Sequence, residues 1–318
     1  MYLETVAEKY VNAGGEIIRL LRNDNISENI ILNTRFKTCH IPAHADNLSL
    51  KFTFIGKEFY EYGQKKVSVS PNNFLLINQG QEHESWIESA DWVNSFAIYF
   101  NPTFATGVYN DLTLSDERLI DEPFELLDAK GRICFFQNLF PNNPDFMRDV
   151  SLFKAYLEKT EGKDKLDIDE KLRYLLSKFI RIHHKDLSDK IKRVDAAKRS
   201  TRLEIVRRIH IARDFIESFF TREITIRDIS ESCFLSENLM LRYFKNVFGL
   251  SPHQYIINKR LELAREFLET SDMPFNEITI VSGFSCASSF GRLFKNRYGI
   301  TPNSLRKGAN SSSYPAGI

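Results

Sequence analysis

The chain has 318 residues, 42% of them hydrophobic and 27% charged, and its formal net charge at pH 7 is +1. This is a globular composition, and the length is enough for two hydrophobic cores, so we expect two domains. No run of about 18 apolar residues occurs, so the sequence predicts no membrane span.

The sequence carries no sign of export. Its first 22 residues place acidic side chains ahead of their apolar part, unlike a signal peptide. The four cysteines, Cys39, Cys134, Cys233 and Cys286, lie far apart and lack the spacing of a metal site. We expect reduced thiols and a cytoplasmic protein.

Residues 1–100 predict a helix followed by strands. Leu3, Val6, Ala7 and Tyr10 recur at helical spacing within residues 1–22. From residue 47 to residue 100, short apolar or alternating runs rich in Phe, Ile and Val are separated by glycine or proline. Several short strands at this spacing predict a small sandwich or barrel.

Residues 115–185 are expected to be helical, most clearly in DIDEKLRYLLSKFIRIHH at 167–184. An apolar stripe at helical spacing comprises Ile168, Leu172, Leu175, Leu176, Phe179, Ile180 and His183. The stripe has two interpretations, packing against the barrel or pairing of two subunits.

A polar, charged segment at 186–202 is expected to link the two domains. Helical periodicity returns from residue 203, and a second long helix is expected from Tyr255 to Leu268. Lys259, Arg260 and Arg265 are expected on its outer face. Residues 307–318 are expected to form a flexible tail.

One stretch of sequence occurs twice. Residues 234–252, FLSENLMLRYFKNVFGLSP, recur at 284–302 as FSCASSFGRLFKNRYGITP, an offset of 50 residues without a gap. Such a repeat means one supersecondary unit used twice. In the first copy a short helix at about 226–231 precedes a turn near 233–235 and a helix from Ser236 to Gly249. This order predicts a helix-turn-helix, repeated in the second copy with a turn at Gly283.

The second helix of each copy has an apolar and a polar face. The apolar set of the first copy is Leu239, Met240, Tyr243, Phe244 and Val247. On the other face Arg242 and Arg292 share one register, and a guanidinium matches the O6/N7 edge of guanine in the major groove. Lys245 and Lys295 suit phosphates. A single arginine on a helix surface is ordinarily only solvated. Core packing does not explain why two helices carry an arginine at the same position, so a shared binding role is favoured.

These residues resemble the DNA-binding domain of the AraC/XylS family of bacterial transcription regulators, over about residues 205–306. The resemblance implies two helix-turn-helix units joined by a longer helix. By this resemblance the base-facing positions are Asn238, Leu241 and Arg242 in the first recognition helix and Ala287, Ser288, Gly291 and Arg292 in the second. The second helix is poor in side chains that read bases, so its unit is expected mainly to hold the DNA backbone.

Residues 68–84, SVSPNNFLLINQGQEHE, resemble the cupin-like effector-binding barrel that precedes this domain in many family members. Metal-binding cupins carry a His-x-His pair, whereas His40 and His44 here are four residues apart. The partners that His83 would need are missing from the pattern. With no catalytic motif elsewhere, we expect no catalytic residue, no metal and no cofactor.

The expected fold is multidomain α+β. It has a cupin-like barrel with accessory helices at 1–185, a linker at 186–202, and an all-α domain with two helix-turn-helix motifs at 203–306. Residues 186–318 carry 21 Lys and Arg against 15 Asp and Glu, whereas the first 185 carry 22 against 27, and a basic half suits phosphate binding.

The expected function is ligand-responsive, sequence-specific transcription activation, not catalysis. The expected partners are double-stranded DNA, RNA polymerase, a small-molecule effector and a second copy of the chain. One alternative is a cupin-type small-molecule binding protein or enzyme with a helical interaction module. Another is a family member that has lost control by a ligand.

Overall fold

The computed structural model describes residues 2–10, 28–63, 65–115, 132–135, 139–159 and 164–306. It divides into two compact units, residues 1–189 and 190–318, which are taken in turn below. Helices α5 (Lys165–Lys192) and α6 (Arg199–Phe219) both enter the segment expected to be a linker. Within 186–202, only residues 193–198 are therefore not α-helical.

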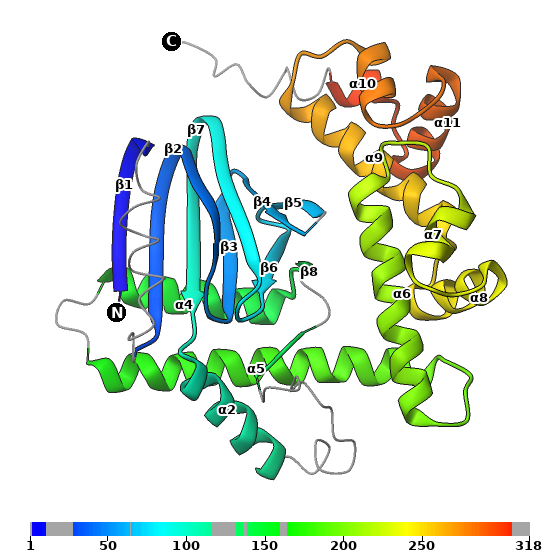
Figure 1. Ribbon diagram of the computed structural model, residues 1–318. Helices are drawn as coiled ribbons and strands as arrows, with labels where there is room; N and C mark the ends of the chain where they lie inside the picture. Colours follow the sequence, from blue (N-terminus) through cyan, green and yellow to red (C-terminus); the bar gives the residue numbers. More distant parts are fainter. Residues whose placement is uncertain are drawn as a thin grey trace, which may run out of the picture. The chain divides into compact units, whose positions relative to one another are not determined.

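The first unit is built on one eight-stranded sheet that forms a cupin-like barrel (Figure 1). Its strands are β1 (Tyr2–Tyr10), β2 (Ile30–Ala45), β3 (Ser49–Ile55), β4 (Glu58–Tyr62), β5 (Lys65–Val69), β6 (Asn73–Ile77), β7 (Glu82–Tyr99) and β8 (Leu139–Pro141). Their order is β1-β2-β7-β3-β6-β8, and β4 pairs with both β5 and β7. The pair β1–β2 is parallel and the other pairs are antiparallel.

The two longest strands extend beyond what the sequence predicts. β2 lies wholly outside the expected strand region, and β7 begins at Glu82, well ahead of the expected run 92–100. The β2–β7 register shifts between Phe36 and Thr38 and again between Ile41 and His44. Each shift interrupts the alternation of buried and exposed residues by which strands are recognised in a sequence.

The expectation of an N-terminal helix is wrong. Tyr2–Tyr10 is a strand whose register runs from Tyr2 opposite Ile31 to Tyr10 opposite Cys39. A single amphipathic stretch is marginal as an isolated helix, whereas backbone pairing along the open edge of β2 supplies hydrogen bonds for its full length. Residues 11–22 of the expected helix lie outside the described residues.

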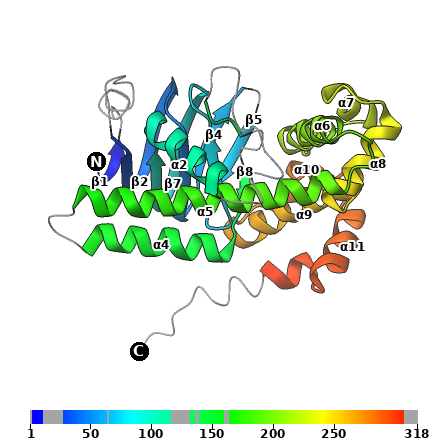
Figure 2. The same ribbon diagram turned by 90° about the horizontal axis from the view of Figure 1, so that it is seen from below.

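An aromatic core joins the sheet to helices α4 (Pro144–Lys159) and α5, which lie side by side in Figures 1 and 2. The ring of Phe179 on α5 lies 5.2 Å from that of Phe140 and 5.8 Å from those of Phe74 and Phe146. The buried residues on α5 include Leu172, Leu175, Leu176, Phe179 and Ile180. This confirms that the stripe packs inward, while subunit pairing through these helices stays a prediction.

The second unit is helical. After α6 its helices are α7 (Ile226–Ser232), α8 (Glu237–Phe248), α9 (Pro252–Thr270), α10 (Phe275–Val281) and α11 (Ala287–Tyr298). The long helix α9 buries Ile256, Leu261, Ala264 and Leu268. The predicted barrel and the predicted pair of helix-turn-helix motifs are both confirmed. No helix in the described part of the chain is long and apolar enough to cross a membrane.

We predict that Phe179→Ala destabilises the barrel unit by about 3–5 kcal/mol, because it leaves a cavity among buried rings. The control is Leu166→Ala on the same helix, whose side chain is 76% exposed and whose loss should change stability by no more than about 0.5 kcal/mol. Urea unfolding of the full chain measures both. Equal effects of the two substitutions would contradict the assignment of Phe179 to the core.

Candidate functional site

The helical unit contains two helix-turn-helix units whose recognition helices end in the same way. In the first, the Thr225 hydroxyl accepts a hydrogen bond from the Asp228 amide at 3.1 Å, and the Asp228 carboxylate accepts from the Thr225 amide at 2.8 Å. This capping box starts α7. The recognition helices α8 and α11 end at Gly249 and Gly299, both with a left-handed φ of 75°.

The two units do not share one sequence offset throughout. Helix α7 starts at 226 and α10 at 275, an offset of 49, whereas α8 starts at 237 and α11 at 287, an offset of 50. The turn of the second unit therefore has one more residue. Because Phe234 N donates to Glu231 O and Gly283 N donates to Ile280 O, the counterpart of Phe234 is Gly283. The ungapped pairing of Phe234 with Phe284 is wrong at the turn.

The turn position requires a left-handed backbone in both units. Gly283 has a φ of 86°, and a Cβ built there would lie 2.8 Å from the Thr221 carbonyl oxygen, so only glycine fits. Phe234 has a φ of 55° and a side chain that is 80% exposed. A side chain in this conformation costs roughly 1–2 kcal/mol. Phe284, by contrast, is buried in the core of the second unit.

The apolar face of α8 is close to that expected from the sequence. Met240, Tyr243, Phe244 and Val247 are buried. Leu239 is 39% exposed, so its assignment to the buried face is wrong. Leu239 adjoins the buried Met240 in sequence but lies just beyond the edge of the buried face.

Three of the polar residues predicted on α8, Asn238, Arg242 and Lys245, are exposed, and Leu241 is half-buried. Arg242 Nη2 donates to the Tyr243 hydroxyl at 2.7 Å, and its guanidinium lies 4.5 Å from that ring. The Tyr243 hydroxyl in turn donates to the Asp195 carbonyl at 3.1 Å. A guanidinium has five N–H donors, so this single contact orients Arg242 and leaves it able to bind a further partner.

On α11, Ser288, Arg292 and Lys295 are exposed, whereas Ala287 and Gly291 are half-buried. No atom lies within 4 Å of the position that a Cβ on Gly291 would occupy. The helix therefore presents a nearly bare backbone between its polar side chains, and another molecule could approach it closely.

The outer face expected on α9 is wrong for two of its three basic residues. Arg260 Nε donates to the Phe220 carbonyl at 2.6 Å and Nη2 to the Arg222 carbonyl at 2.8 Å. Lys259 pairs with Glu217 at 3.1 Å. Both side chains therefore fasten α9 to the end of α6, and periodicity alone could not reveal this. Arg265 is exposed, as expected.

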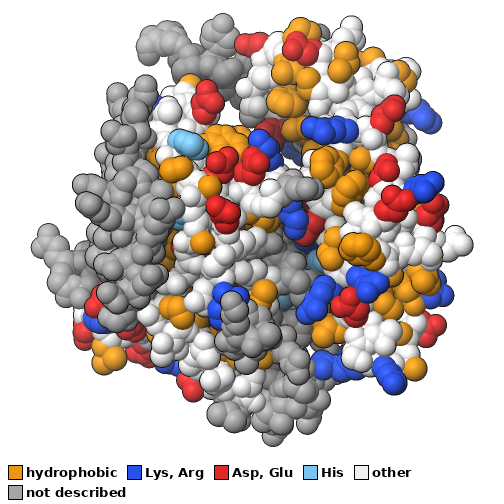
Figure 3. Space-filling model, viewed as in Figure 1, with side chains coloured by type: hydrophobic (Ala, Val, Ile, Leu, Met, Phe, Trp, Pro, Cys, Tyr) orange, Lys and Arg blue, Asp and Glu red, His pale blue; other side chains and the backbone are white. Residues whose placement is uncertain are grey.

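The surface of the helical unit is not uniformly basic. In Figure 3 basic, acidic and hydrophobic side chains are interspersed over its visible face. Binding of a polyanion would therefore depend on the basic side chains of the recognition helices rather than on a field of one sign over the whole unit.

The barrel contains a cavity of about 30 Å³ with both apolar and polar lining residues. Its polar and titratable lining comprises Thr34, Cys39, His44, Lys51, Glu58, Tyr60, His83, Ser85, Ser95 and Tyr99. Burial raises the pKa of Glu58 and lowers that of His83 to about 2, so His83 is neutral at physiological pH. Burial opposes the charge of Lys51, but the nearby Asp46 carboxylate outweighs it and raises the pKa of Lys51.

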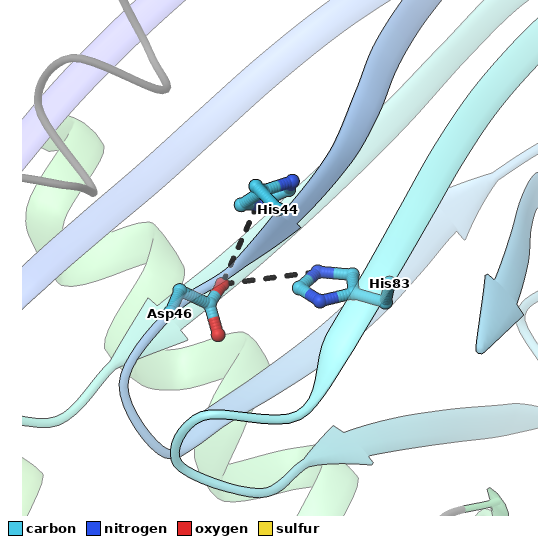
Figure 4. A group of neighbouring side chains, drawn as sticks. All are labelled: His44, Asp46 and His83. Atoms are coloured by element: carbon cyan, nitrogen blue, oxygen red, sulfur yellow. Dashed lines mark ion pairs between the residues drawn. The ribbon is translucent and has the colours of Figure 1, made fainter. Parts of the chain in front are cut away.

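The fold brings three side chains together that the sequence does not connect. His44, Asp46 and His83 are all buried, and one possible ligand atom from each lies within 4.8 Å of the others (Figure 4). The expectation that His83 lacks partners is wrong. In the sequence, only the His44-x-Asp46 spacing hinted at this cluster. The position of His83 opposite His44 depends on the register shift between Ile41 and His44, which the sequence does not predict.

Two family models match the chain. Residues 37–176 match the model of an AraC-like ligand binding domain, and residues 229–308 match that of a helix-turn-helix domain. Together they cover more than half of the chain. The chain belongs to the AraC family. Both domain types of that family are therefore present here, in the order that the sequence predicts.

Curated relatives match this AraC-family chain in its C-terminal part. A probable transcriptional regulator, LumQ of Photobacterium leiognathi, is 33% identical over 28% of this chain and 36% of its own length. The HTH-type transcriptional regulator ExsA of Pseudomonas aeruginosa is 31% identical over 30% of this chain and 34% of its own length. The match thus spans about a third of each relative.

Among solved structures, ToxT from Vibrio cholerae aligns over 88% of this chain and 98% of its own, with 15% identity and a TM-score of 0.35. At that score the two chains do not superpose closely as wholes.

We predict that Phe234→Gly stabilises the helical unit by about 0.5–1 kcal/mol, because relief of the left-handed strain exceeds the added entropy of the unfolded chain. Phe234→Ala is the control, since it removes the same exposed ring but keeps a Cβ at this position. The midpoint of urea unfolding, followed by far-UV circular dichroism, measures both. Equal stabilisation by the two variants would show that the ring, not the backbone, is responsible.

Proposed function

We propose that the chain is a sequence-specific, DNA-binding transcription regulator that acts as an activator. The observation that carries this proposal is the pair of helix-turn-helix units, each with an exposed arginine at the same position of its recognition helix, Arg242 and Arg292. No packing requirement explains this agreement. The description of LumQ and ExsA as transcriptional regulators supports it.

In this proposal α8 reads bases. Asn238 can pair with adenine N6 and N7, Leu241 can contact a thymine methyl group, and Arg242 can pair with guanine O6 and N7. Lys245, on the same exposed face, neutralises a phosphate. The Tyr243 contact holds the guanidinium of Arg242 in one orientation before DNA arrives, which reduces the entropy lost on binding.

Helix α11 has a different balance of contacts. Among its predicted base-facing residues, Ser288 and Arg292 have side chains that can hydrogen-bond to bases, and Lys295 suits a phosphate. Ala287 and Gly291 offer no donor, but their small size lets the helix approach the groove closely. We therefore assign the second unit mainly to positioning on the DNA backbone.

The barrel unit is proposed to bind a small effector and, with its helices, to pair two copies of the chain. As an activator the protein would meet RNA polymerase at its promoters, in the cytoplasm. The match of residues 37–176 to a ligand-binding domain supports the effector. The exposed side chains of Leu152 on α4 and of Tyr174 on α5 support a pairing surface.

The test is fluorescence anisotropy of the full chain with random genomic duplexes, titrated with salt. Steep loss of affinity with rising salt is expected, because cationic side chains release counterions from the phosphates. Selection from a random pool then identifies the preferred site. A folded chain that binds no duplex at low salt would overturn the proposal.

We predict that Arg242→Ala weakens binding to the selected site by about 1–3 kcal/mol and flattens the preference at one base pair. Arg148→Ala, which removes an exposed arginine from α4 in the barrel unit, is the matched control and should leave the preference unchanged. Competition binding with single-base variants of the site measures this. If Arg242→Ala weakens selected and random DNA equally, Arg242 contacts only the backbone.

We predict that Lys245→Ala weakens binding to all duplexes alike and lowers the slope of log affinity against log salt by about one. Lys159→Ala, at the end of α4, removes a charge far from the recognition helices in sequence and should leave the slope as it is. An unaltered slope for Lys245→Ala would exclude Lys245 from the interface.

A further inference from the structure

Strand register brings two histidines face to face at one end of the barrel. After the register shift in β2, His44 lies directly opposite His83 of β7, and their ring centroids are 4.4 Å apart. Asp46 follows two residues after His44, in the connection to β3. All three side chains are buried.

The hydrogen bonds of the two imidazoles fix their tautomers. Nδ1 of His44 lies 2.9 Å from the Pro42 carbonyl, and Nδ1 of His83 lies 3.3 Å from the Gln81 carbonyl. Because a carbonyl oxygen only accepts, both Nδ1 atoms carry hydrogen in these contacts and each neutral ring has its lone pair on Nε2. A hydrogen bond from Nδ1 to a backbone carbonyl holds the ring so that Nε2 can bind a metal ion.

One carboxylate oxygen of Asp46 is paired with both imidazoles, through Nε2 of His44 and Nε2 of His83, as the dashed lines in Figure 4 mark. Each lies 3.8 Å from Asp46 Oδ2, too far for a hydrogen bond. In a tetrahedral zinc site with bonds of about 2.0–2.1 Å, neighbouring ligand atoms lie about 3.4 Å apart. An octahedral ion with similar bonds would require about 3.0 Å. The observed separations are closer to the tetrahedral spacing.

The adjoining space is small. His44 and His83 line the cavity of about 30 Å³. That volume holds one or two water molecules and is well below the volume of a sugar or an aromatic acid. It suits the water that completes the coordination of a metal ion with three protein ligands.

We propose that the barrel binds a Zn²⁺ ion through Nε2 of His44, Nε2 of His83 and the carboxylate of Asp46, with a water molecule from the cavity as fourth ligand. Binding of the ion goes beyond the proposed function and does not depend on it. Control of DNA binding by zinc would rest on that function. The ligand set differs from the His-x-His pattern of metal-binding cupins, since Asp46 stands where the second histidine would be.

The Lys51 ammonium competes with the metal ion for the Asp46 carboxylate, and this competition provides a further test of the proposal. Its Nζ lies 3.3 Å from Asp46 Oδ2 and 3.8 Å from the centroid of the Tyr99 ring. In the ion-free protein the ammonium balances the carboxylate, and zinc must replace it as the partner of Oδ2. The ring of Tyr99 then remains as a cation-binding surface for the ammonium.

The experiment uses the full chain after removal of metals with a chelator. Zinc content after dialysis, calorimetric titration with Zn²⁺ and the visible spectrum of the Co²⁺ form measure the stoichiometry and the geometry. One ion per chain, with the intense visible bands of tetrahedral Co²⁺, is expected. His44→Gln and His83→Gln should each lower the affinity by more than about 100-fold, because loss of a residue that only hydrogen-bonds to a ligand already costs roughly 10–100-fold.

The matched control is His40→Gln, on the same strand but with a side chain that is 62% exposed, and it should leave the affinity unchanged. Lys51→Met should raise the affinity by about tenfold or more, since it removes a competing cation. A purely structural cluster would show no gain.

Absence of stoichiometric zinc in both the unsubstituted chain and Lys51→Met would overturn the proposal. Binding that survives both histidine substitutions would also overturn it and would point to exposed thiols such as Cys134 and Cys286. DNA binding is measured on the same samples. Zinc binding without DNA binding would reject the proposed function and retain the zinc site.

Discussion

The antiparallel pairing of β2 with β7 is the interaction on which the barrel unit depends. It joins the two longest strands, and β7 also pairs with β3 and β4, so most of the sheet is assembled around it. The same pairing also determines which side chains meet in the barrel, because its second register shift places His44 opposite His83. A regular ladder with one residue more or fewer would turn one of these side chains to the other face.

The helical unit depends on α9 in a comparable way. Its buried residues complete the core of the second helix-turn-helix, and Arg260 and Lys259 fasten it to the end of α6. Some basic residues of the helical unit, such as Arg260 and Lys259, therefore make contacts inside the unit and are not available to a partner. The basic excess of residues 186–318 therefore overstates the positive charge on the exposed surface of the unit.

Elements that repeat or have a strong local signal could be predicted from the sequence. The recognition helices have a helical period, and their C-terminal ends at Gly249 and Gly299 are found as expected. The strand at Tyr2–Tyr10, the full length of β2 and β7, and the approach of Asp46 to His83 could not be predicted. Each depends on pairing between distant segments, and a local pattern carries no information on which edge is open or where a bulge falls.

The unequal turns of the two helix-turn-helix units have a consequence for protein engineering. The halves are not interchangeable cassettes, because one connects its helices through Phe234 and the other through Gly283 plus one extra residue. A chimera that exchanges only the recognition helices can follow the repeat as written, because α8 and α11 keep the offset of 50 residues. An exchange of whole units at that offset would shift the first helix by one residue relative to the segment before it and rotate its buried face by about 100°.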